Sequence, residues 1–410
     1  MSESDREFDV VVFGATGFTG QLVAEYMGEQ YGPAGDLRWA IAGRSQAKLD
    51  AVASGLPGEI ECLVADSANA EDMRTLAART RVVCTTVGPY AKYGSELVAA
   101  CVEQGTHYCD LAGEIHWMRR MIDAHQSAAE RSGARIVHTC GFDCIPSDLG
   151  TLFVQNAMRE RAGEPANHVK FRVVASKGGA SGGTIDSGVN MMEEARDDPQ
   201  ILELNADPYA LNPLNMPRGL DGLDQTSAEQ DPDFRQWTAP FVMASINTRV
   251  VRRSNALMNY AYGHDFRYDE AVLTGTGAAG FAKAAALAAG TAMMMGAMAI
   301  GPIRNLVLPL LPKPGEGPSK ETRENGYFEI ALLGLNPNDP EGNVRATIKG
   351  DRDPGYGSTS KMLAESAVCL ARDALEVAGG FWTPASAMGT QLIERLDSNA
   401  GVTFTLDTVN

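Results

Sequence analysis

The chain has 410 residues, of which 44% are hydrophobic and 21% charged, and its formal net charge at pH 7 is -17. This length suits two or three domains with a large buried core, and the negative charge excludes binding to nucleic acid or anionic lipid through overall charge alone. The seven cysteines form no C-x-x-C pair and the six histidines no H-x-x-x-H spacing. We therefore expect a reduced, cytoplasmic protein without a structural metal site.

The first predicted elements are a strand, a tight turn and a helix. An apolar, β-branched run from Val10 leads into three glycines, Gly14, Gly17 and Gly20, and then into the amphipathic segment Gln21–Tyr26. Glycines allow the sharp turn and let a pyrophosphate approach the helix N-terminus, whose N–H groups and dipole favour an anion. The spacing G-x-x-G-x-x-G is a variant of the dinucleotide-binding fingerprint. The predicted cofactor-binding loop comprises Gly14, Ala15, Thr16, Gly17, Phe18, Thr19 and Gly20.

A second strand is predicted at Leu37–Ala42, and it ends in Gly43, Arg44 and Ser45. Enzymes that prefer NAD usually place an acidic residue here for the ribose 2′-hydroxyl, whereas a basic residue pairs with a 2′-phosphate. Arg44, assisted by the Ser45 hydroxyl, therefore predicts NADP(H) as the cofactor. The alternative is that Arg44 is only a surface residue of a βα loop.

The following elements continue to alternate between strand and helix patterns. Strands are predicted at Ile60–Ala65, Val82–Val87, His107–Leu111 and Arg135–Cys140. Helices are predicted at Ala70–Arg79, Ser95–Gln104 and Trp117–Ser132. Six short strands with helical crossovers predict an α/β fold, a doubly wound parallel sheet with its ligand crevice at the carboxyl ends of the strands. Four residues at or after strand ends complete the predicted cofactor contacts: Asp66, Val87, Gly88 and Pro89.

Beyond Pro146 the pattern changes to strands separated by long connections rich in Gly and Asp. Strands are predicted at Val169–Ala175, Ala244–Val251, Tyr327–Leu333 and Asn343–Lys349. Amphipathic helices are predicted at Met362–Val377 and Thr383–Leu396. Mixed strands of this kind predict a second α/β domain that carries the substrate.

The segment Ala284–Ile303 contains no charged residue and is rich in Ala, Gly and Met. Its length approaches that of a membrane span, but Ala and Gly contribute little apolar area and Pro302 interrupts its end. We therefore expect a buried or interfacial helix. Three interpretations stay open: an acyl-chain site, since Met suits irregular apolar ligands, a membrane-contacting lid, and a core or dimer helix.

Three strand ends would converge on the nicotinamide side of the crevice, and they carry Tyr90, Tyr93, Asp110 and Cys140. A tyrosine, or a water held by Asp110, could protonate a substrate or hydrogen-bond its carbonyl group. Three of these residues also have a structural interpretation. Asp110 could cap a turn, Cys140 could be a packed thiol and Tyr90 could stack on the cofactor.

The motifs together resemble those of the saccharopine-dehydrogenase-like oxidoreductases, and within them most closely the actinobacterial trans-acting enoyl reductases. The motifs that carry this resemblance are Gly14–Gly20, Ala42–Ser45, Thr86–Tyr90, Tyr108–Glu114, Cys140–Asp143, Lys177–Thr184, Asn247–Ser254 and Gly350–Tyr356.

The resemblance implies a Rossmann-like NADP-binding domain over residues 1–145 and an inserted mixed α/β substrate domain over 146–359, with an apolar helix near 284–303. The C-terminal helices of 360–410 would pack back on the first domain. It also implies an NADPH-dependent reductase of an enoyl double bond in a polyketide- or fatty-acyl-derived precursor of cell-envelope glycolipids. Tyr90, Asp110 and Cys140 occupy the positions at which the saccharopine enzymes line the nicotinamide site.

One departure bears on the substrate. A saccharopine-type substrate needs converging basic groups, and the one compact basic run here is Arg249, Arg252 and Arg253. A hydrophobic acyl or polyketide substrate therefore fits better. The alternatives are a saccharopine-type enzyme acting at a C–N or C=O centre, and a non-catalytic NADP(H)-binding protein associated with a membrane or partner. A homodimer and peripheral contact with the plasma membrane are further expectations.

Overall fold

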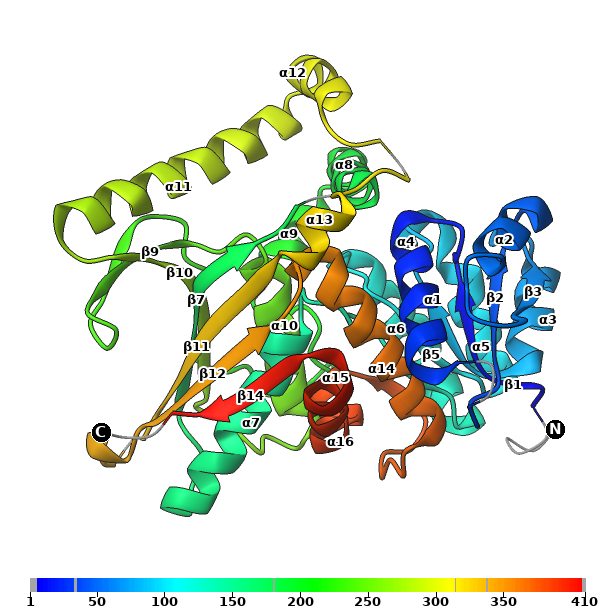
Figure 1. Ribbon diagram of the computed structural model, residues 1–410. Helices are drawn as coiled ribbons and strands as arrows, with labels where there is room; N and C mark the ends of the chain where they lie inside the picture. The colour runs from blue at the N-terminus through cyan, green and yellow to red at the C-terminus, as the bar shows by residue number, and fades with distance from the viewer. Residues whose placement is uncertain (1–5, 33–34, 180, 314, 337, 408–410) are drawn as a thin grey trace.

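Two seven-stranded sheets organise the chain (Figure 1). The computed structural model describes residues 6–32, 35–179, 181–313, 315–336 and 338–407. In the first sheet the strand order is β13-β6-β5-β4-β1-β2-β3, and every neighbouring pair is parallel. Its strands are β1 (Phe8–Phe13), β2 (Trp39–Gly43), β3 (Glu61–Val64), β4 (Thr80–Thr85), β5 (His107–Cys109), β6 (Arg135–Val137) and β13 (Gly380–Trp382).

Strand β1 shows why this sheet forms from continuous apolar runs. All six of its residues are buried, as is usual for a parallel strand covered on both faces. Val10 and Val12 pack into a core with α1 (Phe18–Tyr31) and α14 (Thr359–Arg372). Val11 and Phe13 pack into a second core on the opposite face, with α3 (Ala70–Arg79), α5 (Ser95–Gln104) and α6 (Ile115–Ser132). The predicted doubly wound α/β fold is thus confirmed.

Local signals set the helix ends in this half of the chain. The Asn69 side chain accepts a hydrogen bond from the Glu71 N–H at the start of α3, and Gly105 and Gly133 end α5 and α6 in the left-handed conformation. Helices α3 and α5 have the predicted bounds. The shorter helices α2 (Gln46–Ala53) and α4 (Tyr90–Tyr93) follow β2 and β4.

The second sheet is mixed, with strand order β14-β12-β11-β7-β10-β9-β8. The pair β7–β10 is parallel, and the other pairs are antiparallel. Its strands are β7 (His168–Lys177), β8 (Glu229–Asp231), β9 (Gln236–Pro240), β10 (Arg267–Gly275), β11 (Tyr327–Leu335), β12 (Val344–Gly350) and β14 (Val402–Leu406). Burial alternates along β12, because one face packs on helix α7 (Ile145–Ala162).

The predicted strand at Ala244–Val251 is wrong, because this segment lies within helix α10 (Ala244–Leu257). The β-branched pair Val250–Val251 favoured a strand, but the helix packs against α7 and β10 with three arginine side chains buried. Thr248 and Ser254 each donate a hydroxyl hydrogen bond to the carbonyl four residues earlier, as helical residues do.

The C-terminal residues contribute to both sheets. Helix α14 lies between the sheets and packs on α1, β1 and β4 (Figure 1), whereas β14 pairs with β12 in the second sheet. The predicted helix Met362–Val377 ends at Arg372. The predicted helix Thr383–Leu396 is two helices, α15 (Pro384–Ala387) and α16 (Gly389–Arg395), because Gly389, the first residue of α16, adopts a left-handed φ of 48°.

The apolar segment forms helix α11 (Gly277–Ala299), followed by α12 (Gly301–Val307). A core position for this segment is wrong. Only 6% of its most apolar 18-residue window is buried, and α11 is, among the described residues, the one helix long and apolar enough to cross a membrane. The start of α11 packs on β9 and β10 of the second sheet, and Figure 1 shows the rest of α11 and α12 projecting from the body of the molecule.

Candidate active site

The glycine loop between β1 and α1 has the shape that a pyrophosphate requires. Gly14 has a φ of 92°, and a Cβ there would lie 2.8 Å from Thr86 Oγ1 and from a methyl group of Val87. A Cβ at Gly20 would overlap the Gly14 carbonyl oxygen. Gly17 is exposed and precedes the first turn of α1 with no side chain capping it. The loop therefore leaves the helix N-terminus open to an anion and tolerates no side chain at Gly14 or Gly20.

Two groups stand free at the carboxyl end of β2. Arg44 is exposed and forms no hydrogen bond or ion pair with any residue that the structure describes. Ser45 precedes α2 without using its side chain as a cap. A basic and a hydroxyl group that have no internal role suit the 2′-phosphate of NADP(H). A shallow pocket of about 490 Å³ opens beside this loop, lined by Thr16, Gln21, Glu25, Lys48, Ala51, Val52, Gly55 and Leu56.

The remaining predicted cofactor residues lie at neighbouring strand ends. Val87 follows β4, and one of its methyl groups lies 2.8 Å from the point that a Cβ at Gly14 would occupy. Gly88 is exposed and Pro89 buried. Asp66 follows β3, where its carboxylate accepts the Ala68 N–H at 3.0 Å, so its side chain stabilises a turn.

Asp110, at the end of β5, is completely buried and surrounded by donors. Its carboxylate accepts the Tyr108 hydroxyl at 2.8 Å and the His138 Nδ1 at 2.7 Å. It also accepts the N–H groups of Ala112 and Thr139, both at 3.0 Å. These four bonds tie β5 to the segment after β6 and give this carboxylate a positioning role.

Tyr90 and Cys140 lie in the same buried layer. The Tyr90 hydroxyl donates to the Thr85 carbonyl at 3.3 Å, and its ring stacks on Trp117. Burial raises the pKa of both the Tyr90 phenol and the Cys140 thiol well above the usual values, so both stay protonated. Tyr93, in contrast, is 41% exposed on α4. The structure thus brings Tyr90, Asp110 and Cys140 together and sets Tyr93 apart, and their catalytic roles stay predictions.

Two acidic residues of this region are absent from the predicted site. Glu114 accepts the N–H groups of Tyr90 and Ala91, both at 2.8 Å, and so fixes the start of α4. Asp143 follows β6, and its carboxyl group has no hydrogen-bond or ionic partner among the described residues. Burial raises its pKa to about 6. Its place in the Cys140–Asp143 motif, after a predicted strand, is the one sequence signal that points to it.

Helix α8 (Gly182–Asp197) and two loops of the second half of the chain cover this crevice. Ser187 of α8 lies 3.6 Å from the Cβ position of Gly88 and hydrogen-bonds Glu114. The Tyr356 hydroxyl bonds Thr184 of α8 at 2.7 Å, and its ring packs edge-on against Phe18 of the glycine loop. Residues from outside the nucleotide-binding sheet therefore lie against its strand ends and the glycine loop.

The basic run on α10 is fully used inside the protein. Arg249, Arg252 and Arg253 are buried. Their partners are, in order, the carboxylates of Asp224 and Asp221 and the backbone carbonyls of Leu211 and Phe381. None of these three cations is left for an anionic substrate.

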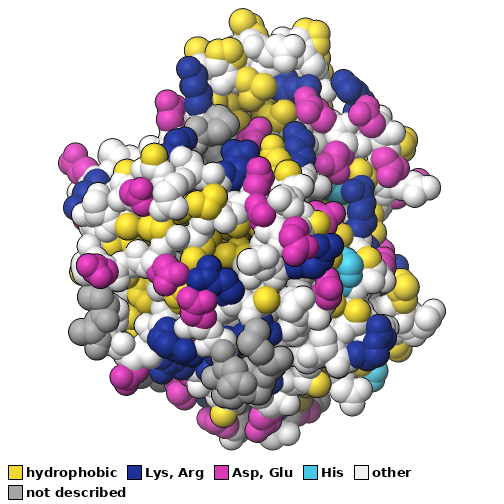
Figure 2. Space-filling model, turned by 90° about the vertical axis from the view of Figure 1, so that its right-hand side faces the viewer, with side chains coloured by type: hydrophobic (Ala, Val, Ile, Leu, Met, Phe, Trp, Pro, Cys, Tyr) yellow, Lys and Arg dark blue, Asp and Glu magenta, His cyan; other side chains and the backbone are white. Residues whose placement is uncertain are grey.

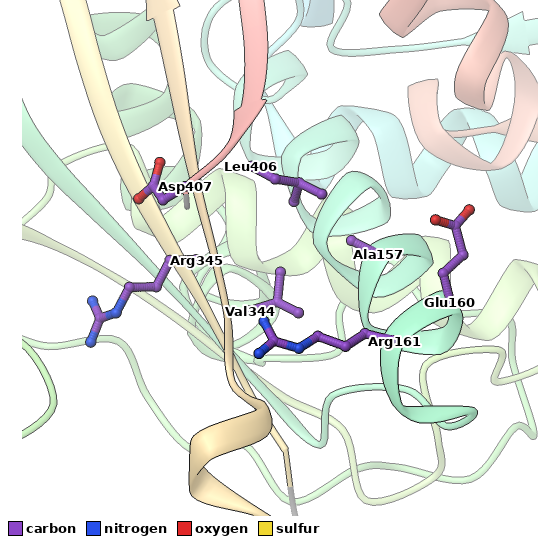
Figure 3. Close-up of a pocket in the computed structure, with 7 residues that line it drawn as sticks. All are labelled: Ala157, Glu160, Arg161, Val344, Arg345, Leu406 and Asp407. Atoms are coloured by element: carbon purple, nitrogen blue, oxygen red, sulfur yellow. The ribbon is translucent and has the colours of Figure 1, made fainter. Parts of the chain in front are cut away.

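A pocket of about 290 Å³ lies elsewhere, between the end of α7 and strands β12 and β14 (Figure 3). It is lined by Ala157, Glu160, Arg161, Val344, Arg345, Leu406 and Asp407. Figure 3 shows the side chain of Arg345 pointing away from Glu160 and Arg161. This pocket contains none of the predicted site residues.

A parallel sheet, a glycine loop at the helix α1 N-terminus and a free arginine at the end of β2 define an NADP-dependent oxidoreductase. The family model for the saccharopine dehydrogenase NADP binding domain matches residues 10–137. Trans-acting enoyl reductases of Mycobacterium tuberculosis and Mycobacterium leprae are 38% and 37% identical to this chain, over 98% of each chain. A second M. tuberculosis protein, to which the same name is given provisionally, is 40% identical over 98% of both chains.

This chain belongs to the saccharopine-dehydrogenase-like family that includes the trans-acting enoyl reductases, which confirms the predicted resemblance and cofactor. The apo saccharopine dehydrogenase (L-Glu forming) of Saccharomyces cerevisiae has a similar structure, with a TM-score of 0.52, over 98% of this chain and 99% of that one. At 13% identity, this similarity shows the fold alone.

Proposed function

We propose that this protein is an NADPH-dependent enoyl reductase that reduces the C=C bond of a fatty-acyl- or polyketide-derived thioester. The observation that carries the proposal is the sequence similarity to proteins named trans-acting enoyl reductases, which are 40% and 38% identical to this chain over 98% of its length. The glycine loop and Arg44 support the cofactor. The resemblance to actinobacterial enzymes further supports a precursor of cell-envelope glycolipids as the substrate.

The pairing of the buried arginines of α10 with internal acceptors supports an apolar substrate. A saccharopine-type substrate carries several carboxylates, which need basic partners. Arg249, Arg252 and Arg253 are buried and already paired with internal acceptors. These three arginines are therefore not available to the carboxylates of a saccharopine-type substrate.

Each group of the site has a defined task in this reaction. The glycine loop holds the pyrophosphate, and Arg44 and Ser45 hold the 2′-phosphate. NADPH, when bound, supplies a hydride to the β-carbon of the enoyl group and is oxidised to NADP+. The α-carbon must then receive a proton. Asp143 fits this role best, because its carboxyl group has no partner among the described residues and its pKa, raised to about 6, leaves a fraction of this group protonated near neutral pH. Tyr93 is the exposed alternative.

A single-turnover assay tests the proposal. Purified protein is mixed with NADPH and 2-enoyl thioesters of increasing chain length, and nicotinamide fluorescence reports oxidation. We expect oxidation with the enoyl thioesters and none with their saturated counterparts. Oxidation with 2-oxo acids and amines instead would support the saccharopine-type alternative, and NADPH binding without turnover on either panel would support the non-catalytic one.

Two expectations about partners and location are also part of this proposal. The first is a homodimer, which sedimentation of the purified protein tests. The second is a cytoplasmic protein in peripheral contact with the plasma membrane, which fractionation of cells tests.

A further inference from the structure

We infer that residues 277–313, here named the apolar ridge, dock on the surface of an anionic lipid bilayer and lie in the plane of its interface. This inference concerns how the protein is placed on a membrane, and it does not depend on the reaction that the site catalyses.

The apolar ridge exposes side chains that soluble surfaces usually bury. Met293 and Leu306 are each 75% exposed, and Leu310 is 82% exposed. The other large exposed side chains are Phe281, Leu287, Met294, Met295, Ile300 and Ile303. Figure 2 shows hydrophobic side chains gathered over the protrusion at the top of the molecule. A contiguous patch of this kind marks an interaction surface.

The charges of this segment differ from those of the rest of the chain. Between residues 271 and 315 the sequence has none of the 52 acidic residues of the protein, while Lys283 and Lys313 are basic and exposed. The third basic residue, Arg304, is paired with Glu193 of α8. An anionic membrane repels a protein of net charge -17, except through a surface that lacks acidic groups and carries basic ones. The charge distribution therefore favours binding of the ridge, rather than of the rest of the protein, to an anionic lipid surface.

The two ends of the ridge are fixed to the same folded body. At its start, Phe281 packs against Trp237 of β9, and the Gly280 carbonyl accepts the Thr274 hydroxyl at 2.9 Å. At its far end, Arg304 of α12 forms an ion pair with Glu193 of α8 at 3.1 Å. A helix held on one side of a membrane at both ends cannot cross it. The ridge therefore lies along the interface instead of spanning the bilayer.

The ridge also continues into the cover of the crevice. The Glu316 carbonyl accepts the N–H of Gly182 at the start of α8. Gly317 packs directly against the ring of Phe18 in the glycine loop. Membrane docking would thus place the covered crevice next to the lipid phase, where an acyl substrate partitions.

The test is co-sedimentation of the full-length protein with vesicles of phosphatidylcholine alone and of phosphatidylcholine mixed with phosphatidylglycerol. We expect binding to the mixed vesicles and little to the neutral ones. The triple variant Met293→Gln, Leu306→Gln, Leu310→Gln should lose about tenfold or more in partition. Replacing Lys283 and Lys313 by Gln should weaken binding about fivefold per residue at low salt.

The matched control is the triple variant Leu202→Gln, Leu214→Gln, Leu220→Gln, which changes equally exposed leucines outside the ridge. It should bind the mixed vesicles like the wild type, and all variants should keep their melting temperature and NADPH affinity. Equal loss in the control, or no binding of the wild type to either vesicle, would overturn the inference. Self-association that is lost with the ridge variant in the absence of lipid would overturn it as well, since the ridge would then bind a second copy.

Discussion

Replacing Arg44 by Ala isolates the contribution of the 2′-phosphate to cofactor binding. Arg44 is exposed and has no partner among the described residues, so its loss should change the free energy of unfolding by no more than about 0.5 kcal/mol. A charge-assisted hydrogen bond to a phosphate contributes about 1.5–3 kcal/mol. We therefore expect the Kd for NADPH to rise by about tenfold to a hundredfold, while the Kd for NADH, which lacks the phosphate, stays the same.

Fluorescence titration with NADPH and NADH, paired with thermal melting, measures both effects. The matched control is Arg131→Ala, an exposed arginine in the last turn of α6, at the end of the sheet away from the crevice. It should alter neither affinity. An equal loss of affinity for NADPH and NADH, or no loss for NADPH, would refute the role assigned to Arg44.

Three further predictions concern the glycine loop and two acidic residues, Asp148 and Asp143. Gly20→Ala should abolish tight NADPH binding and cost about 1–3 kcal/mol of stability, because its Cβ overlaps a backbone carbonyl; Gly290→Ala, with no atom within 4 Å of its Cβ position, should be neutral or slightly stabilising. Burial raises the pKa of Asp148 to about 7, above its unfolded value. The folded state therefore retains this proton between about pH 4 and pH 7, and stability falls by about 1.4 kcal/mol per pH unit as pH rises through that window. The free energy of unfolding of Asp148→Asn, measured by denaturation at several pH values, should not show this decline. A pH slope equal to that of the wild type would contradict the role assigned to Asp148. Asp143→Asn should lower kcat by about 10²–10⁴ without changing NADPH affinity, and the wild-type rate should fall as pH rises above about 6; an unchanged pH profile in the variant would assign the proton to another group.

The first sheet could be predicted because its signals are local. Buried parallel strands are continuous apolar runs, and the ends of α3, α5 and α6 are marked by Asn69, Gly105 and Gly133. Strand β13 was missed because three residues carry too little pattern, and its pairing with β6 joins segments far apart in the chain.

The second half was harder to predict because long-range contacts decide it. Helix α10 buries Arg249, Arg252 and Arg253. The sequence does not show which distant residues accept the hydrogen bonds of these arginines. Strand β14 similarly depends on pairing with β12.

The same distinction separates the two parts of the site. The glycine loop and Arg44 could be located because a short motif defines them. The environments of Asp110 and Asp143 could not be predicted. Asp110 accepts four hydrogen bonds and Asp143 accepts none from the residues that the structure describes, and this difference depends on β5 and β6 lying side by side.

The measurement that tests the proposed reaction most directly is the transfer of deuterium. Purified protein is incubated with a long-chain 2-enoyl thioester and NADPH deuterated at one of the two C4 positions of the nicotinamide, and the product is examined by mass spectrometry and NMR. We expect a saturated thioester with deuterium on its β-carbon, from one of the two labelled cofactors only. Failure to transfer deuterium to enoyl thioesters of any chain length, or its appearance on a carbonyl carbon or on a carbon bonded to nitrogen, would contradict it.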